Sequence, residues 1–185
     1  MRKWAFILST AILYFVLPED ASAQRYLPGM RGLQFTTGTT KNGYHSGIAF
    51  SWYTKRADRW MFGAEYIEKR YPYKNIKIPQ SIFMIDAGYY LKLLSDQSKT
   101  FFLSIGASGV AGYETINWND KILYDGATII NSDNFIYGGA FSLEMEIYLT
   151  DRTVFLANTR ERLLLGSSVG KFHTQFGLGI KFIIN

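Results

Sequence analysis

The chain has 185 residues, a formal net charge of +5 and no cysteine, with 48% hydrophobic and 17% aromatic side chains. This length fits one domain, and the absence of cysteine excludes disulfide scaffolds, thiol catalysis and an acylated lipoprotein anchor. The 17 glycines, 13 tyrosines and 14 phenylalanines favour an all-β protein over a disordered chain or a coiled coil.

The N-terminal segment has the three parts of an export signal. Two basic residues precede a mostly apolar run from Trp4 to Leu17, and a small-x-small sequence follows. We therefore predict a signal peptide over residues 1–23, cleaved between Ala23 and Gln24, and one outer-membrane β-barrel domain over residues 24–185. An N-terminal membrane anchor is the disfavoured alternative, because this run is shorter than the about 20 apolar residues that span a bilayer.

The rest of the chain is dominated by an alternation of apolar residues with small or polar ones at a period of two, which is the pattern of strands with two different faces. The C-terminal segment shows it best. Phe172, Phe176 and Phe182 share one face there, while Gln175 and Lys181 lie on the other. In chain order, the alternation predicts strands near residues 32–38, 46–53, 60–67, 83–92, 101–113, 135–149, 154–165 and 172–185.

The connections between these segments alternate between two kinds. Short polar turns are predicted at residues 55–58, 95–98 and 151–152. Tight turns at one end of a sheet and longer loops at the other are typical of outer-membrane barrels, so we predict a small antiparallel transmembrane β-barrel of about eight strands. Apart from a short connection near residues 40–43, the predicted loops of the second kind are longer or richer in Pro, Gly and Asn and cover residues 72–79, 114–133 and 166–170.

The polar face of the strands separates a barrel in lipid from a soluble barrel or sandwich. This face is rich in Gly and Ser, which are too small to cover a water-exposed surface, and aromatic residues gather near both strand ends as in the two girdles of a membrane barrel. A narrow barrel has room inside for a few long charged side chains, which need partners there. We predict a plugged interior with a structural charge network, rather than a channel, formed by Glu65, Asp86, Glu144, Glu146, Arg160, Arg162 and Lys181.

Several long stretches resemble one known protein family. They are residues 24–30, 62–71, 112–118, 125–128 and 166–177, the last running on to the C-terminus. Over essentially the whole mature chain the sequence resembles the TraO family, conjugal-transfer proteins of Bacteroides-type conjugative transposons. The resemblance implies an outer-membrane component of a DNA-transfer apparatus, with other conjugation proteins as partners and no family active site.

Two other functions stay open on the residues alone. One is a general small outer-membrane barrel for adhesion or envelope integrity. The other is an outer-membrane lipid esterase, in which His45 or His173 would activate Ser46, Ser167 or Ser168. Chance proximity is the favoured explanation of these residues, so we predict no catalytic site. With two histidines and no metal-loop spacing, we also predict no metal and no cofactor.

The longest predicted loop carries the candidate extracellular contact residues Trp118, Leu123, Tyr124 and Asp125. A loop with aromatic and aliphatic side chains can form a contact surface or fold over the barrel mouth as a lid, and both alternatives stay open. Basic residues are spread along the chain, so we expect contacts with outer-membrane lipid and transfer proteins and no direct binding of nucleic acid. Both termini are predicted to lie in the periplasm.

Overall fold

The computed structural model describes residues 28–123, 125–129, 133–168 and 170–184. The predicted signal peptide with its cleavage site between Ala23 and Gln24 lies outside the described residues, as does Tyr124. The elements are β1 (Arg31–Thr40), β2 (Gly43–Tyr53), the 3₁₀ turn η1 (Lys55–Ala57), β3 (Arg59–Tyr73), β4 (Ile76–Ser95), β5 (Phe101–Ile116), the 3₁₀ turn η2 (Asn117–Asn119), β6 (Asn134–Tyr148), β7 (Thr153–Leu165) and β8 (Phe172–Ile184).

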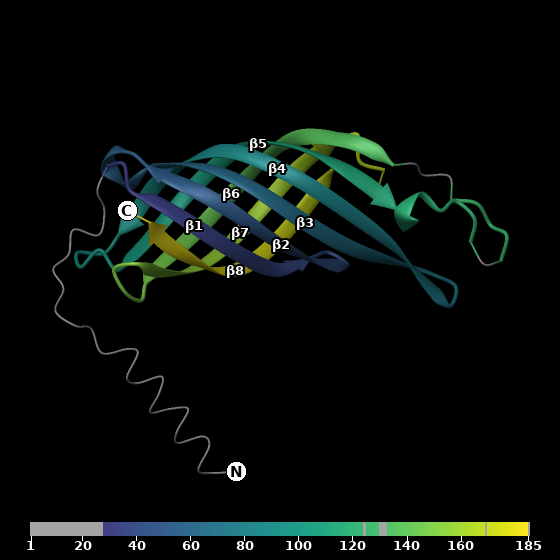
Figure 1. The fold of residues 1–185 in the computed structure, drawn as a ribbon, viewed down its shortest axis with the longest axis horizontal. Helices are drawn as coiled ribbons and strands as arrows, with labels where there is room; N and C mark the ends of the chain where they lie inside the picture. Colours follow the sequence, from purple (N-terminus) through teal and green to yellow (C-terminus); the bar gives the residue numbers. More distant parts are fainter. Residues whose placement is uncertain (1–27, 124, 130–132, 169, 185) are drawn as a thin grey trace, which may run out of the picture.

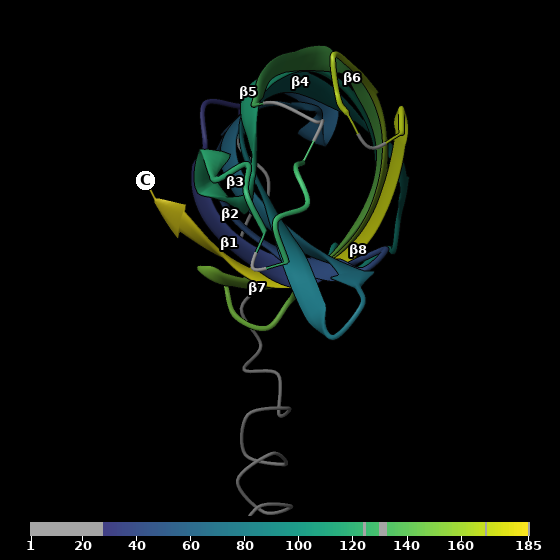
Figure 2. The ribbon, with the colours of Figure 1, turned by 90° about the vertical axis from the view of Figure 1, so that its right-hand side faces the viewer.

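The eight strands form one closed antiparallel barrel (Figures 1 and 2). Each strand pairs with its neighbours in sequence, and β8 pairs with β1 from Arg31↔Ile184 to Thr40↔Gln175. Closure removes the sheet edges that would leave backbone groups unpaired in lipid. The predicted all-β fold, a small antiparallel transmembrane barrel of about eight strands, is confirmed. In the described part of the chain, no helix is long and apolar enough to cross a membrane.

The strands are strongly tilted against the barrel axis. Trp52 lies beside the tight turn after β2. The residues paired directly across successive strands, starting from Trp52, form a row that runs around the barrel. This row ends at Thr174 on β8, beside the loop at the opposite end of the barrel. Such a stagger accompanies barrel closure and leaves a narrow interior that side chains can fill.

The two faces of the strands differ in the sense that a membrane barrel requires. On β8, Phe176, Leu178 and Ile180 are exposed on the outside, whereas Gln175 and Lys181 are buried inside. The same alternation of exposed and buried residues runs along the other strands. An apolar outside with a polar inside is the reverse of a soluble barrel and is suited to lipid.

Aromatic side chains gather on the outside near both ends of the strands, as predicted. Near the tight turns, the rings of Trp60 and Tyr89 lie 4.9 Å apart in an edge-on contact. Near the long loops, the rings of Tyr66 and Phe83 lie 5.1 Å apart. Rings at both levels are suited to the two interfaces of a bilayer.

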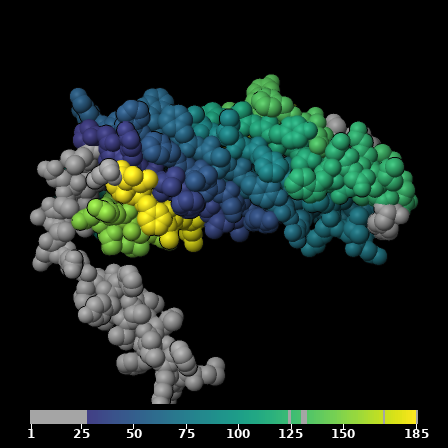
Figure 3. All heavy atoms as spheres, in the orientation of Figure 1, coloured from purple at the N-terminus to yellow at the C-terminus, as the bar shows by residue number. Residues whose placement is uncertain are grey.

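The predicted loop over residues 72–79 is wrong, because β3 and β4 stay paired as far as Tyr73↔Ile76. The loop was predicted because Pro72 and Pro79 lack the backbone N–H that strand pairing normally uses. Beyond Lys69 the strand β2 no longer pairs with β3, and β5 pairs with β4 only from Gln80 onward. Both prolines therefore lie on a two-stranded ribbon with free edges, where a missing N–H is tolerated. This ribbon and the segment after β5 form the right-hand end of the molecule in Figure 3.

Two adjacent glycines on β6 provide a test of which residues face the barrel interior and which face outward. A Cβ on Gly138 would lie 1.9 Å from the carbonyl oxygen of Leu163, whereas a Cβ on Gly139 would meet only the carbonyl oxygen of Ser108, at 3.7 Å. We expect Gly138→Ala to destabilise the barrel by about 1–3 kcal/mol through overpacking. Gly139→Ala should leave the urea unfolding midpoint of the purified barrel almost unchanged, and equal effects of the two changes would contradict the assignment.

Candidate functional site

A first group of buried charges, the turn-end cluster, lies inside the barrel near the tight turns. Arg59 Nη2 lies 2.6 Å from Glu144 Oε1, and Arg59 Nη1 lies 3.6 Å from Glu146 Oε2. Lys181 Nζ lies 3.3 Å from Glu144 and also pairs with Glu146. The Tyr53 hydroxyl donates to Glu146 at 3.0 Å and accepts from Lys181 at 3.1 Å. Two cations face two carboxylates, so the cluster is neutral.

A second group, the central cluster, is formed by charges from β3, β4 and β7. Arg160 Nη1 lies 3.5 Å from Glu65 and 3.4 Å from Asp86. Arg162 Nη2 forms a closer ion pair with the same oxygen of Glu65, at 2.5 Å. Arg160 also donates to the Tyr90 hydroxyl at 2.9 Å, which fixes the guanidinium between the strands. This cluster joins two guanidinium groups to two carboxylates, so it too pairs two cations with two anions.

A third group, the mouth cluster, lies at the long-loop end of the barrel. The carboxylate of Glu114 is buried and accepts hydrogen bonds from Ser167 Oγ at 2.8 Å and from the backbone N–H of Ser168 at 3.1 Å. Lys69 Nζ forms a hydrogen bond with His173 Nδ1 beside them. The cluster therefore ties the loop between β7 and β8 to the inner wall of the barrel.

The structure places all seven predicted interior charges inside the barrel and joins them in the turn-end and central clusters. Sequence reasoning missed Arg59, Lys69 and Glu114, which are also buried. Strict alternation from Met61 would have placed Arg59 inside, but Arg59 fell between the predicted turn at residues 55–58 and the predicted strand that began at residue 60. The predicted strands ended before Lys69 and Glu114, so their faces were not assigned.

The histidines are held by groups other than serine. His45 Nδ1 lies 3.1 Å from Glu65, and its Nε2 lies 3.1 Å from the carbonyl oxygen of Phe176. Ser46 faces the opposite side of β2. In the mouth cluster both serines bind the carboxylate, and the histidine binds the lysine. These contacts differ from the nucleophile–base hydrogen bond of a serine hydrolase.

Side chains fill the interior around these clusters. A cavity of about 20 Å³, lined by Glu65, Asp86, Asn158 and Arg160 among others, has room for about one water molecule. Among the described residues, no group of three or more histidine, aspartate and glutamate side chains is placed to hold a metal ion. Two apolar clusters fill further interior space: Met30, Tyr53, Phe102, Tyr148, Val154, Leu156 and Ile183, and Ile67, Ile82, Met84, Val110, Ile136, Ala140 and Leu164.

The segment between β5 and β6 projects from the long-loop end next to the tip of the β3–β4 hairpin (Figure 1). Asp125 lies 2.5 Å from Lys74 at that tip and also accepts a hydrogen bond from Tyr73 at 3.4 Å. The hydrogen bond from the Lys74 ammonium lowers the pKa of Asp125. Trp118 is 66% exposed, whereas Leu123 is buried. Of the predicted contact residues, Trp118 therefore offers surface, Asp125 ties the segment to the hairpin, and Leu123 holds the segment together.

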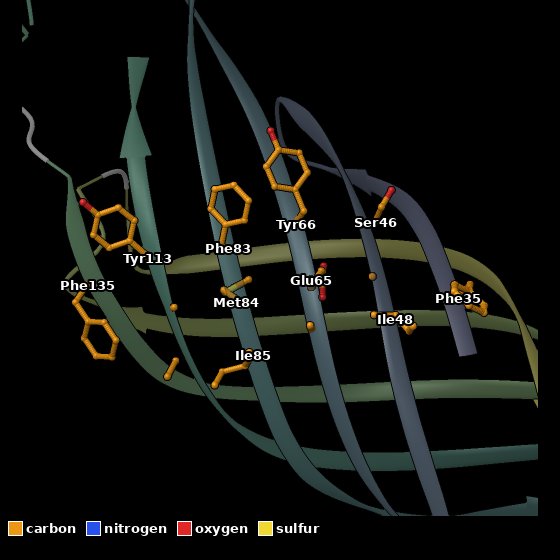
Figure 4. Close-up of a pocket in the computed structure, with 14 residues that line it drawn as sticks. Phe35, Ser46, Ile48, Glu65, Tyr66, Phe83, Met84, Ile85, Tyr113 and Phe135 are labelled. Carbon is orange, nitrogen blue, oxygen red and sulfur yellow. The ribbon is translucent and has the colours of Figure 1, made fainter. Parts of the chain in front are cut away.

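A hollow of about 780 Å³ lies on the outer face of β1 to β6 (Figure 4). Tyr66, Phe83 and Phe135 stand at its rim, and Ala64 and Ala111 leave room between them. The hollow faces the surroundings of the barrel and is lined mainly by apolar groups, so it is suited to hydrocarbon and not to a polar substrate.

The turn-end cluster should be far more important for stability than the exposed pair on the hairpin. Replacing Glu144 by Ala leaves Arg59 and Lys181 with one carboxylate, which we expect to cost about 3–5 kcal/mol of unfolding free energy because a buried charge loses its partner. Asp125→Ala, which removes an exposed pair, should have little effect on the urea unfolding curve of the barrel. Similar losses from both variants would contradict a buried charge network.

Known structures share this fold. The chain is similar to the N-terminal β-barrel domain of Pseudomonas aeruginosa OprF, with a TM-score of 0.51 and 12% identity over 84% of this chain and 98% of that chain. It is also similar to Ail, the attachment invasion locus protein of Yersinia pestis, in complex with a heparin analogue, with a TM-score of 0.55 and 7% identity over 84% of this chain and 97% of that chain. At such identities the likeness shows the fold alone.

In sequence, no curated protein matches the chain. A family model described as conjugative transposon protein TraO matches residues 25–184. The match spans all eight strands of the barrel and the segments between them. The chain therefore belongs to the TraO family of conjugative transposon proteins.

Proposed function

We propose that the protein is a non-enzymatic outer-membrane barrel that serves conjugative DNA transfer as a structural or docking component. Membership of the TraO family supports the link to transfer. The observation that carries the docking role is the filled, charge-paired interior. A barrel whose inside is occupied by paired side chains has no room for DNA, so it acts through its surfaces.

In this proposal the barrel has a defined orientation in the membrane. The apolar outer face contacts outer-membrane lipid, the tight turns face the periplasm, and the long loops face outward, as in other barrels of this type. Arg31 pairs with Ile184 at the tight-turn end, so both described chain ends lie on the periplasmic side in this orientation. Export requires the signal peptide over residues 1–23, with cleavage between Ala23 and Gln24.

The docking surface in this proposal is the extended end formed by the β3–β4 hairpin and residues 117–123 and 125–129. Trp118 and Ile122 are 66% and 68% exposed there, and large apolar side chains at an exposed tip favour a protein contact. The partner is another protein of the transfer apparatus. We propose no direct contact with nucleic acid, because Arg70 and Lys74, two of the basic side chains at this end, are already paired with Glu68 and Asp125.

Replacing residues 118–129 with a short Gly-Ser linker should reduce transfer in a mating assay to the level of a deletion strain, while the barrel remains folded in the outer membrane. The physical reason is the loss of the exposed apolar tip without loss of the barrel. The control inserts the same linker at residues 96–98, in a tight turn at the other end. Full transfer by the loop variant would refute docking through this segment, and full transfer by the deletion strain would refute the role in conjugation.

The purified barrel should carry no steady ion current in a planar bilayer, because paired charges and apolar clusters block its interior. An open porin under the same conditions provides the control. A stable conducting state of the intact protein would contradict the filled interior and favour a channel.

A further inference from the structure

The outer face of the barrel carries a carboxylate in its apolar band. Glu161 lies on β7 and is half-buried among outward-facing side chains. Leu163 follows it toward the loops on the same face, Thr159 and Ala157 precede it toward the turns, and its pairing partners are Phe141 and Thr174. The other outward charges of the described strands lie at or beyond the ends of neighbouring strands: Arg31, Glu68, Arg70 and Lys77.

The carboxylate of Glu161 is only partly satisfied within the chain. Thr174 Oγ1 donates to Glu161 Oε2 at 2.5 Å, and among the described residues no second donor reaches it. A carboxylate accepts about four hydrogen bonds, and hydrocarbon offers none. Ionisable groups at such a depth usually have a partner, so the geometry calls for a donor from outside the chain.

A hydrogen-bond donor at nearly the same membrane depth as Glu161 lies on β1, which flanks β8 on the side opposite to β7. The Thr39 hydroxyl on β1 is exposed and forms no hydrogen bond with the described residues. Phe176 on β8 pairs with both Thr39 and Thr159. With strands tilted by about 40°, each step to the next strand raises the paired residue by roughly 3 Å toward the loops. Glu161 lies two residues above Thr159, so it reaches nearly the same depth as Thr39.

We propose that the protein forms a two-fold symmetric dimer in the membrane through the outer faces of β7, β8 and β1. A two-fold axis along the membrane normal, passing beside β8, brings β7 of one copy against β1 of the second copy. Glu161 of each copy then accepts a hydrogen bond from Thr39 of the other, and the two carboxylates stay on opposite sides of the axis.

The apolar surface beside the axis supports the same arrangement. Phe176, Leu178 and Ile180 form an exposed ridge along β8, with 61%, 55% and 44% of their surface accessible. Because β8 is tilted by about 40° against the axis, the two ridges cross near Phe176, which packs against its counterpart just below the two polar contacts, while Leu178 and Ile180 lie progressively further from the axis. The chain thus supplies both the acceptor and the donor of a self-complementary face, which favours a second copy over lipid or an unrelated protein as the occupant.

The natural absence of cysteine permits a direct test by disulfide cross-linking in the outer membrane. Phe176→Cys lies beside the proposed axis, and the matched control Ile85→Cys is a similarly exposed residue on β4 across the barrel. We expect Phe176→Cys to form a cross-linked homodimer on oxidation at least about tenfold more efficiently than the control. Equal cross-linking, or a Phe176→Cys adduct with a different protein in place of the dimer, would overturn the proposal.

Two further variants test the polar contact. Glu161→Leu and Thr39→Val, each combined with Phe176→Cys, should lower the dimer yield about tenfold, because each removes the same pair of hydrogen bonds. Glu161→Gln keeps an acceptor oxygen and should retain most of the dimer. The mass of the purified barrel in detergent gives an independent measure. An unchanged yield for both apolar variants would overturn the role of these residues, whatever the mating assay shows.

Discussion

Closure of an eight-stranded sheet gives every strand two opposite environments. Each strand pairs on both sides, so the backbone is satisfied within the barrel and only the side chains meet lipid on one face and the narrow interior on the other. Because successive side chains alternate, a shift of one residue in register would place Lys181 in lipid and Ile180 inside. The alternation and the pairing register therefore depend on each other, and the positions of the charge clusters follow from both.

The interior charges remain tolerable because they occur in matched sets. Desolvation penalises every buried charge, and a guanidinium or ammonium inside a barrel is compensated only when carboxylates lie within ion-pair distance. The turn-end and central clusters each join two cations to two carboxylates. Strands far apart in sequence contribute to each set, as Arg59 and Glu144 show, so the pairs also hold the two sides of the barrel together.

Much of this fold could be predicted from the sequence, because a period of two is visible in a single chain. The same pattern located the seven predicted interior charges, and it would have found Arg59 had the strand been started one residue earlier. The β3–β4 hairpin could not be predicted in this way. Pro72 and Pro79 usually end strands, and they are tolerated here only because β2 and β5 stop pairing before they are reached.

The contact segment shows the other limit of sequence reasoning. Trp118 and Leu123 looked equivalent as apolar residues in a long loop, yet one is exposed and the other is buried. The segment folds back on itself at Leu123, whose N–H donates to the carbonyl oxygen of Ala127, and Asp125 binds Lys74 on the neighbouring hairpin. A local pattern of residues carries no information about the partner on the hairpin.

A filled barrel has only two kinds of surface with which to act, and in this chain they differ in character. The extended end is exposed to water, is held by the exposed ion pair between Lys74 and Asp125, and presents Trp118. It is therefore suited to a reversible contact with a soluble domain. The outer face meets hydrocarbon, where a single hydrogen-bonding carboxylate discriminates strongly between a matching surface and lipid. Glu161 would be a liability in an isolated barrel, whereas the same residue beside a second copy specifies both partner and depth. The two proposed contacts use separate surfaces, so a dimer contact within the membrane and a docking contact beyond it would be compatible with each other.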